Sequence, residues 1–153
     1  MVSGDDNPVF LDTNILVYAR ATQSPFHQAA LQAIQRLDNS GVKVWISRQV
    51  LREYLATLTR PQLFTNPLPI DRLIEDIRLF QTQFRVAEDD LQVTERLLML
   101  MEQVPIGGRQ VHDANIVATM QAYGIGQLLT HNVADFNRFS EFITVLPLVR
   151  DEA

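Results

Sequence analysis

Short apolar segments alternate with segments of helical periodicity along the chain. The apolar segments contain the β-branched and aromatic residues typical of buried strands, and they lie at residues 9–12, 43–47, 127–130 and 142–146. Between them, apolar residues recur with the spacing of an amphipathic helix. This spacing predicts helices at residues 14–21, 27–39, 48–60, 70–81, 89–104 and 111–123. Apolar strands that alternate with helices predict an α/β fold with a mostly parallel central sheet.

The region from about residue 70 to residue 103 departs from this alternation. It predicts two helices with no long strand between them, although residues 84–87 (FRVA) have the character of a small extra strand. We therefore expect a sheet of four to five strands, with a helical arm packed on its edge. Residues 61–69 contain three prolines and predict a loop, and residues 1–7 are expected to be flexible.

Length and composition limit the classes of protein that fit. No repeat, low-complexity tract or linker divides the 153 residues, so we expect a single domain over residues 1–153. No apolar run approaches the roughly 20 residues of a membrane span. The segment MVSGDDNP carries acids where a secretory signal carries basic residues. The sequence therefore predicts a cytoplasmic protein with no membrane contact.

The available chemistry is that of oxygen and imidazole groups, because the chain has no cysteine. A net charge of −5 argues against coating nucleic acid by bulk electrostatics, although it does not exclude a nuclease. The basic residues are all arginine except Lys43, and the planar guanidinium suits phosphate contacts. Candidates for such contacts, with a plain solvent-facing role as the alternative for each, are Arg20, Arg48, Arg52, Arg109 and Arg138.

Three predicted strands end in polar residues, which are Asp12, Ser47 and Thr130. In open parallel sheets, binding sites lie outside the carboxyl ends of the strands, so these side chains are expected at a common edge. Each could instead cap the helix that follows, because Asp, Ser and Thr accept hydrogen bonds from a helix's first turn. Capping is favoured for Ser47, whereas the two interpretations of Asp12 are evenly balanced.

Asp113 is harder to explain as an ordinary surface acid. Helical spacing aligns it with Ile116, Val117 and Met120, on the side that faces the sheet. The helix dipole stabilises a carboxylate in the first turn by about 0.3 to 1 kcal/mol, which is less than an unpaired buried charge costs. If Asp113 meets Asp12 at the sheet edge, a divalent cation with oxygen ligands would relieve their repulsion.

The remaining acids are ordinary by pattern alone. Glu53 lies to one side of the apolar face that includes Tyr54 and Leu58, so the helical wheel favours a solvent-exposed glutamate. Asp135 has the character of a loop acid. The pattern also predicts a solvated helix face that carries Asp71, Glu75 and Asp76.

Four segments taken together resemble a known family. They are VFLDTNILVY, ISRQVLREYLATLTRP, HDANIVATM and LLTHNVADFNRF, and in order and spacing they resemble the four acidic motifs of the PIN domain. The closest likeness is to the VapC-type toxin ribonucleases of prokaryotic toxin–antitoxin pairs. The resemblance runs from residue 9 to about residue 146, and it implies a three-layer α/β/α sandwich.

The resemblance implies an acidic site with one group from each motif. Its catalytic and metal-binding residues would be Asp12, Glu53, Asp113 and Asp135. In the fourth motif, the group that contributes to metal binding, directly or through water, would be either Asn132 or Asp135. For Glu53, the resemblance outweighs the helical wheel. Residues that orient the acids would be Thr13, Asn14, Thr130 and Asn132.

The implied activity is a Mg²⁺- or Mn²⁺-dependent endoribonuclease, a hydrolase of RNA phosphodiester bonds that uses one or two ions. The family further implies the toxin role, a separately encoded antitoxin and a homodimer. One alternative is a PIN-like protein that binds RNA or a partner without cutting. His112 and His131 adjoin the motifs, and neither is assigned a catalytic role.

A phosphoryl-transfer enzyme that uses Asp12 as its nucleophile is a second alternative. Haloacid-dehalogenase-like phosphatases and response-regulator receivers are of this kind. The segment DTN lacks the second aspartate two positions on, and Lys43 precedes a strand instead of ending one. These departures disfavour that class.

Overall fold

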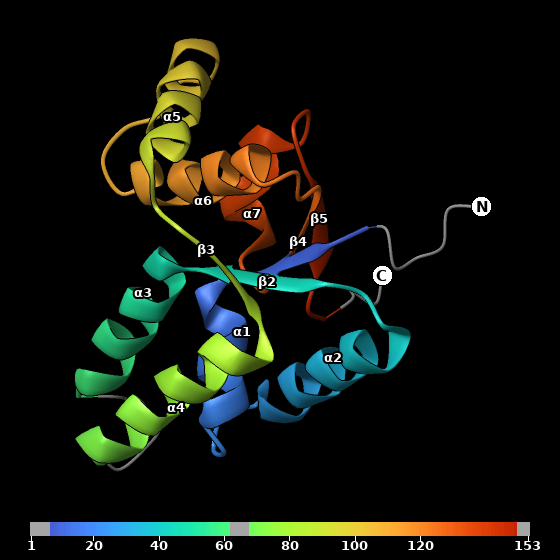
Figure 1. Cartoon of the computed structure of the whole chain (residues 1–153), viewed down its shortest axis with the longest axis vertical. Coiled ribbons are helices and arrows are strands. Elements are labelled where there is room, and N and C mark those ends of the chain that lie inside the picture. The colour runs from blue at the N-terminus through green and yellow to red at the C-terminus, as the bar shows by residue number, and fades with distance from the viewer. Residues whose placement is uncertain (1–6, 62–67, 150–153) are drawn as a thin grey trace.

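A five-stranded sheet forms the centre of the computed structural model, which describes residues 7–61 and 68–149 (Figure 1). Its strands are β1 (Val9–Leu11), β2 (Val44–Ser47), β3 (Arg85–Ala87), β4 (Gln127–Thr130) and β5 (Thr144–Pro147). They are ordered β3-β2-β1-β4-β5, and every neighbouring pair is parallel. The predicted parallel sheet and the small strand near residues 84–87 are confirmed. The flexibility predicted for residues 1–6 and the loop predicted at 62–67 lie outside the described residues.

The helices agree with the sequence prediction to within a few residues at each end. They are α1 (Thr13–Arg20), α2 (His27–Ser40), α3 (Arg48–Thr59), α4 (Ile70–Gln83), α5 (Leu91–Gln103), α6 (Gln110–Ala122) and α7 (Val133–Phe136), followed by the 3-10 helix η2 (Asn137–Phe139). The short α7 and η2 were not predicted. In residues 7–61 and 68–149, no helix has the length and apolar character that crossing a bilayer needs.

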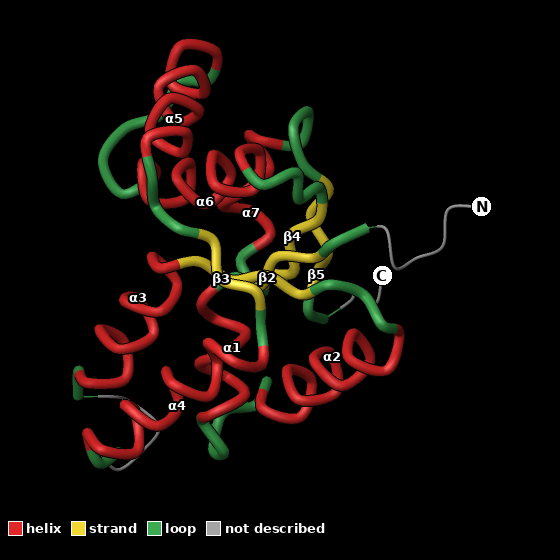
Figure 2. Tube along the Cα trace, in the orientation of Figure 1, coloured by secondary structure: helices red, strands yellow, loops and turns green. Residues whose placement is uncertain are grey.

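The helices cover both faces of the sheet. Figures 1 and 2 show α1 to α4 on one side, and α5, α6 and α7 on the other, which confirms the three-layer arrangement. The predicted helical arm is divided by the edge strand β3. Helix α4 packs against α3 and β3, whereas α5 packs against α6 on the opposite face. The arm is therefore two separate helices, one in each outer layer.

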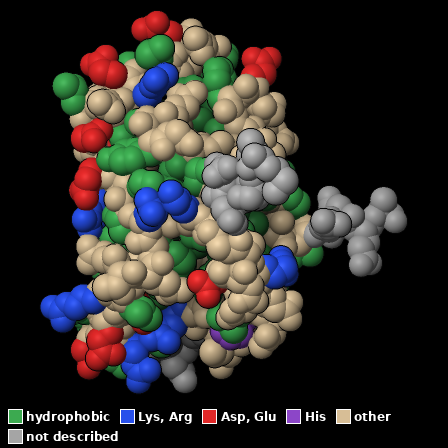
Figure 3. Space-filling view, turned by 45° about the vertical axis from the view of Figure 1, so that its right-hand side comes forward, with side chains coloured by type: hydrophobic (Ala, Val, Ile, Leu, Met, Phe, Trp, Pro, Cys, Tyr) green, Lys and Arg blue, Asp and Glu red, His purple; other side chains and the backbone are tan. Residues whose placement is uncertain are grey.

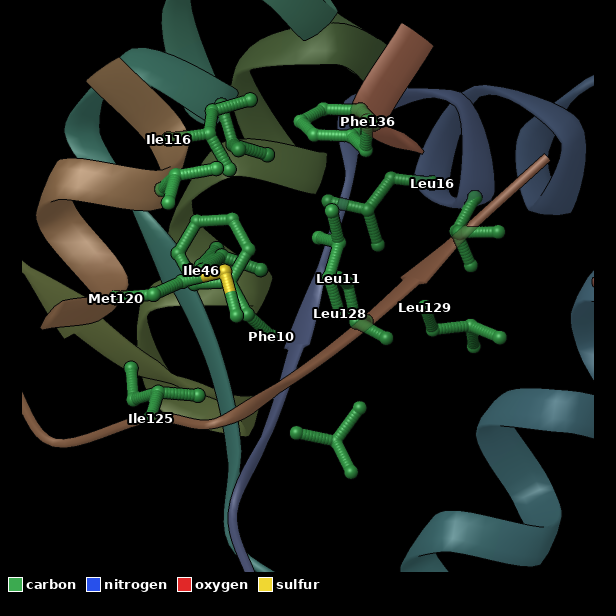
Figure 4. Packing of buried hydrophobic residues seen from close by; sticks show 14 of the residues in the cluster. Phe10, Leu11, Leu16, Ile46, Ile116, Met120, Ile125, Leu128, Leu129 and Phe136 are labelled. Atoms are coloured by element: carbon green, nitrogen blue, oxygen red, sulfur yellow. The ribbon is translucent and has the colours of Figure 1, made fainter. Parts of the chain in front are cut away.

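The core explains why the central strand β1 is apolar along its whole length. Phe10 and Leu11 are neighbours in β1, so their side chains point to opposite faces, and both are fully buried. Figure 4 shows Met120 of α6 beside Phe10, and Leu16 of α1 beside Leu11. A strand that is buried on both faces needs continuous hydrophobic character, which is the pattern in the sequence.

Strands pass directly into helices at the edge of the sheet where polar residues follow them. The Oδ1 atom of Asp12 accepts a hydrogen bond from the backbone N of Thr13 (2.8 Å), which caps α1. Ser47 caps α3 by accepting from the backbone N of Val50 (3.3 Å), as predicted. Gly41 ends α2 with a φ of 77°, a conformation that glycine adopts without strain.

Asp76 differs from the prediction of a solvated acid. Its carboxylate accepts hydrogen bonds from the hydroxyl of Tyr54 (2.6 Å) and from Nη2 of Arg20 (3.1 Å). Burial, and then the Asp76 carboxylate, raise the pKa of Tyr54, so its hydroxyl stays a donor. This cluster joins α1, α3 and α4, three elements whose contact a helical pattern does not reveal. Asp71 and Glu75 are exposed, as predicted.

Candidate active site

A cleft of about 650 Å³ opens at the carboxyl ends of the central strands. Strand β1 lies between β2 and β4, so the chain crosses to the other side of β1 at this point, where open α/β sheets bind ligands. Residues from α1, α3, α6 and the segment after β4 line the cleft. They include Asp12, Thr13, Asn14, Tyr18, Glu53, Arg60, Arg109, His112, Asp113 and Asn132. Three of the four predicted acids therefore share one cleft.

Asp12 is held by hydrogen bonds on both carboxylate oxygens and is only 7% exposed. Its Oδ1 accepts from the backbone N of Thr13 (2.8 Å). Its Oδ2 accepts from the hydroxyl of Thr130 (2.8 Å) and from Nδ2 of Asn14 (3.2 Å). These contacts fix the orientation of the carboxylate at the end of β1. Asp12 is thus both a helix cap and a buried acid, so the two interpretations of this residue were not exclusive.

The segment after β4 is tied to the same network. Asn14 accepts a hydrogen bond from the backbone N of His131 (3.1 Å) through its Oδ1. The hydroxyl of Thr130, which is fully buried, accepts from the backbone N of Asn132 (3.0 Å). The positions of His131 and Asn132 are therefore fixed relative to Asp12.

Glu53 is half-buried in the cleft, in contrast to the exposed glutamate that the helical wheel favoured. Its Oε1 accepts a hydrogen bond from the hydroxyl of Thr13 (2.7 Å). Its Oε2 accepts from Nε2 of Gln49 (3.0 Å). Helix α3 packs against α1 as well as against the sheet, so its buried side is wider than its apolar stripe. Polar residues at the margin of that stripe then meet partners on other helices.

Asp113 lies in the first turn of α6, half-buried, and no hydrogen bond reaches its carboxylate from the described residues. Burial raises its pKa to about 6, and the negative charges of Asp135 and Glu53 add to this effect. The positive charges of Arg138 and His112 oppose it. A carboxylate in this position binds a proton or a cation more readily than an ordinary aspartate does.

The pKa of Asp12 is also raised to about 6, with burial as the largest cause. Hydrogen bonds from Thr130 and Thr13 lower it, while the charges of Glu53 and Asp113 raise it. Two acids of one cleft therefore have pKa values near 6, each raised in part by the charges of its neighbours. Perturbed acids of this kind are frequent at functional sites.

The two candidates of the fourth motif occupy different places. Asn132 lines the cleft with the three acids. Asp135 is exposed and lines a neighbouring hollow, although its charge acts on Asp113. Both therefore stay candidates for the group on the metal side. In the described part of the chain, no three acidic or histidine side chains meet closely enough to chelate one ion unaided.

The candidate arginines separate into two groups. Three form ion pairs, which are Arg20 with Asp76, Arg48 with Glu88, and Arg52 with Asp89. Arg109 lines the cleft, and the charge of Arg138 acts on Asp113. Arg60 also lines the cleft and was not among the sequence candidates. Positive charge near the acids thus comes from Arg109, Arg138 and Arg60.

Gln49 and Asn115 were missed by the sequence analysis. Gln49 is 5% exposed, and its Nε2 donates to Glu53 and to the backbone O of His112 (2.9 Å). Its Oε1 accepts from Nδ2 of Asn115 (2.8 Å). This amide links α3 to the first turns of α6, where Asp113 lies. The available signal was the four-residue spacing of Gln49 and Glu53, which places them on one helix face.

Replacing Gln49 with leucine is expected to lower the melting temperature of the protein by several degrees. The change keeps most of the side chain's volume but leaves Glu53, Asn115 and the backbone O of His112, which are partly buried at these contacts, without the Gln49 amide, at a cost of about 1 to 3 kcal/mol. Thermal unfolding followed by circular dichroism measures it. The control is Gln35→Leu, because Gln35 is exposed on α2. Equal melting temperatures for the two variants would contradict the bridging role.

Comparison with known proteins assigns the family. A sequence profile of the PIN domain matches residues 9–141. The chain belongs to the PIN domain family. This PIN domain is 30% identical over 133 residues to Ribonuclease VapC48 of Mycobacterium tuberculosis, a match that covers 84% of the chain and 89% of that protein. It is 28% identical over 134 residues to Ribonuclease VapC24 of the same organism, with the same coverage of both chains.

Solved structures share the fold of this PIN domain. VapBC2 from Rickettsia felis, bound to a DNA fragment from its promoter, gives a TM-score of 0.66 at 17% identity and covers 92% of this chain and 98% of that one. A toxin–antitoxin complex from Klebsiella pneumoniae gives a TM-score of 0.65 at 20% identity and covers 94% of this chain and 99% of that one. VapC20 of Mycobacterium tuberculosis, a toxin that cleaves the sarcin–ricin loop, gives 0.63 at 20% identity, with 91% and 99% covered. The predicted PIN-like α/β/α fold is confirmed.

Proposed function

We propose that this PIN domain is a metal-dependent endoribonuclease that hydrolyses RNA phosphodiester bonds as the toxin of a toxin–antitoxin pair. One observation carries the proposal. Asp12, Glu53 and Asp113 come from three separate motifs and line a single cleft, in a chain that is 30% identical to Ribonuclease VapC48. The non-catalytic alternative gives no reason for keeping three acids in mutual repulsion at one place.

The donor groups of the cleft fit a hard divalent cation. Carboxylate and amide oxygens are ligands that Mg²⁺ and Mn²⁺ prefer. Asp12 is a buried acid with a raised pKa, so a cation there offsets an existing electrostatic cost. Mg²⁺ in particular keeps several waters and uses only one or two protein carboxylates, which suits an open cleft. The proposed ligands of one or two ions are Asp12, Glu53, Asp113 and either Asn132 or Asp135.

The residues of the chain prepare the cleft for a phosphodiester. Thr13 donates hydrogen bonds to both Asp12 and Glu53, and so holds these two acids in a fixed relation. When bound, the divalent ion supplies activation of the attacking water and neutralisation of charge on the phosphoryl oxygens. Arg109 and Arg138 lie near Asp113 and attract a phosphate to a chain of negative net charge.

The direct test is incubation of the purified protein with single-stranded and structured RNAs, with chelator, Mg²⁺ or Mn²⁺. Cleavage that appears only with a divalent ion supports the proposal. The matched control is the Asp113→Asn variant purified in the same way, which reports any contaminating nuclease. Undiminished cleavage in chelator would overturn metal dependence, and RNA binding without cleavage under every condition would favour the non-catalytic alternative.

The products of cleavage are expected to carry 5′-phosphate and 3′-hydroxyl ends. An activated water attacks the phosphorus and expels the 3′ oxygen, so the ribose 2′-hydroxyl takes no part. Mass spectrometry of the products identifies the ends. A control substrate with a 2′-deoxynucleotide on the 5′ side of the cut should be cleaved equally well. A 2′,3′-cyclic phosphate would refute the mechanism.

An antitoxin partner, a homodimer and a cytoplasmic location belong to the same proposal. The toxin–antitoxin complex from Klebsiella pneumoniae, whose fold the chain shares, supports the antitoxin. Large apolar side chains exposed on the outer helices support contact with other chains, among them Leu91 (75%), Ile70 (59%) and Leu79 (57%). On the face shown in Figure 3, hydrophobic side chains reach the surface among interspersed acidic and basic ones. The cytoplasm is where a ribonuclease of this kind meets RNA.

A further inference from the structure

A second hollow of about 730 Å³ lies beside the acidic cleft. Asn132 lines both spaces, so the two are adjacent. The hollow is walled by the rings of Phe26 and His131, together with apolar side chains that include Val133. Asp135 is the acid on its lining. The hollow therefore joins an aromatic wall to the proposed reaction centre.

Three aromatic rings connect the two spaces. The ring centroids of Phe26 and His131 are 4.1 Å apart, with a tilt of 44°. Tyr18, which lines the acidic cleft, lies 5.1 Å from Phe26 and meets His131 edge-on at 5.5 Å. All three residues are half-buried, so each keeps part of its surface open to solvent. They form a continuous aromatic surface from the cleft into the hollow.

This surface is held rigidly relative to the acids. The backbone N of His131 donates to Oδ1 of Asn14 (3.1 Å), and Asn14 itself donates to Asp12. The backbone N of Phe26 donates to the hydroxyl of Ser24 (3.1 Å), which fixes the loop before α2. A site whose parts are already in place loses little entropy when a ligand binds.

The chemistry of the hollow suits a nucleobase. Proteins recognise unpaired RNA bases by stacking them on Phe, Tyr and His rings, and such stacking tolerates any base. A phosphate is disfavoured there because it would meet the carboxylate of Asp135. The chain has a net charge of −5, so bulk attraction to the RNA backbone contributes little, and base contacts gain importance for affinity.

We infer that the hollow is a nucleobase subsite, in which one unpaired base of the substrate packs against the Phe26 and His131 rings while an adjacent phosphate lies in the acidic cleft. The inference rests on the proposed function and narrows its substrate to RNA with an unpaired base beside the cut. It also gives His131 a part in recognition, outside the chemical step.

The test measures binding without cleavage. Fluorescence anisotropy in chelator gives the affinity of the native protein for a short single-stranded oligoribonucleotide, and then for versions in which each nucleotide in turn is abasic. One abasic position is expected to weaken binding by about five- to tenfold. Phe26→Leu should weaken binding of the intact oligonucleotide by a similar factor. The variant should then bind the abasic version as tightly as it binds the intact oligonucleotide. The control Phe142→Leu alters a half-buried phenylalanine outside both spaces and should bind normally.

Two results would overturn the subsite. Equal affinity of the native protein for all abasic versions is the first, and it needs no variant that might be misfolded. The second is independence of the two changes. If the factor by which Phe26→Leu weakens binding is the same for the intact and the abasic oligonucleotide, the ring and the base do not interact. Cleavage of the same oligonucleotide with Mn²⁺ is measured separately. Base-dependent binding without cleavage rejects only the nuclease function, whereas cleavage with base-independent binding rejects only the subsite.

Discussion

Replacing Asp113 with asparagine is expected to lower RNA cleavage by more than about a hundredfold while the fold survives. Changes to residues that only orient metal ligands already cost about 10- to 100-fold in affinity or activity, so loss of a proposed ligand should cost more. The fold should survive because, in the described part of the chain, the Asp113 carboxylate makes no hydrogen bond that asparagine would break. Cleavage assays with Mn²⁺ and circular dichroism measure the two effects.

The stability of the same variant separates a ligand from a structural acid. In chelator, Asp113→Asn should be at least as stable as the native protein, because it removes a charge that Asp135 and Glu53 repel. Added Mn²⁺ should raise the melting temperature of the native protein by mass action and that of the variant much less. The control Asp38→Asn makes the same charge change at an exposed position of α2 and should keep the native response.

One outcome would assign Asp113 a structural role. If Asp113→Asn is clearly less stable than the native protein in chelator, and still responds to Mn²⁺ as the native protein does, the carboxylate serves packing. The proposed set of metal ligands would then be wrong.

The metal-free protein is expected to lose stability as pH rises from about 4 to about 6. The pKa of Asp12 is raised from 3.8 to about 6, so in this range the native state keeps a proton that the unfolded chain has released. Above it, the native state holds a charged buried acid, at a cost of about 2 to 3 kcal/mol. The half-buried Asp113 should act in the same direction with a smaller effect, because water screens its charge.

Denaturant unfolding of Asp113→Asn and of the native protein, in chelator and at several pH values, separates the contribution of Asp113 from that of the other acids. The free energy of unfolding of Asp113→Asn, minus that of the native protein, should increase between about pH 4 and 6 and stay constant above. A difference that is independent of pH would show that the fold does not raise the pKa of Asp113. Stabilisation by Mn²⁺ should show the opposite trend and grow with pH, because the carboxylates must release protons before they bind metal.

The sheet and the long helices could be predicted because burial leaves a direct record in the sequence. The strand β1 and the centre of β4, Leu128 and Leu129, are buried and apolar, and the polar residues that follow them mark the edge where Asp12 and Thr130 meet. The strand β3 was recognisable from residues 84–87. That it places α4 and α5 on opposite faces of the sheet could not be predicted. Which face a helix covers depends on the direction of the crossover, which hydrophobic periodicity does not encode.

Polar contacts between distant helices could not be predicted. The helical wheel favoured an exposed Glu53, because its partners Thr13 and Gln49 are polar and leave no apolar mark. Asp76 was misassigned for the same reason, since its partners Tyr54 and Arg20 lie on two other helices. Helix α7 spans only Val133–Phe136, which is too short for periodicity to be detected.

The bridge between Gln49 and Asn115 has a consequence for how the sequence can change over evolution. The two residues are 66 positions apart, and each satisfies a polar group of the other. A substitution that removes the amide of Asn115 alone leaves Oε1 of the buried Gln49 without its donor, and loss of Gln49 alone leaves Nδ2 of Asn115 without its acceptor. Lineages of this family should therefore exchange the two residues together, and an alignment should show correlated substitution between positions 49 and 115.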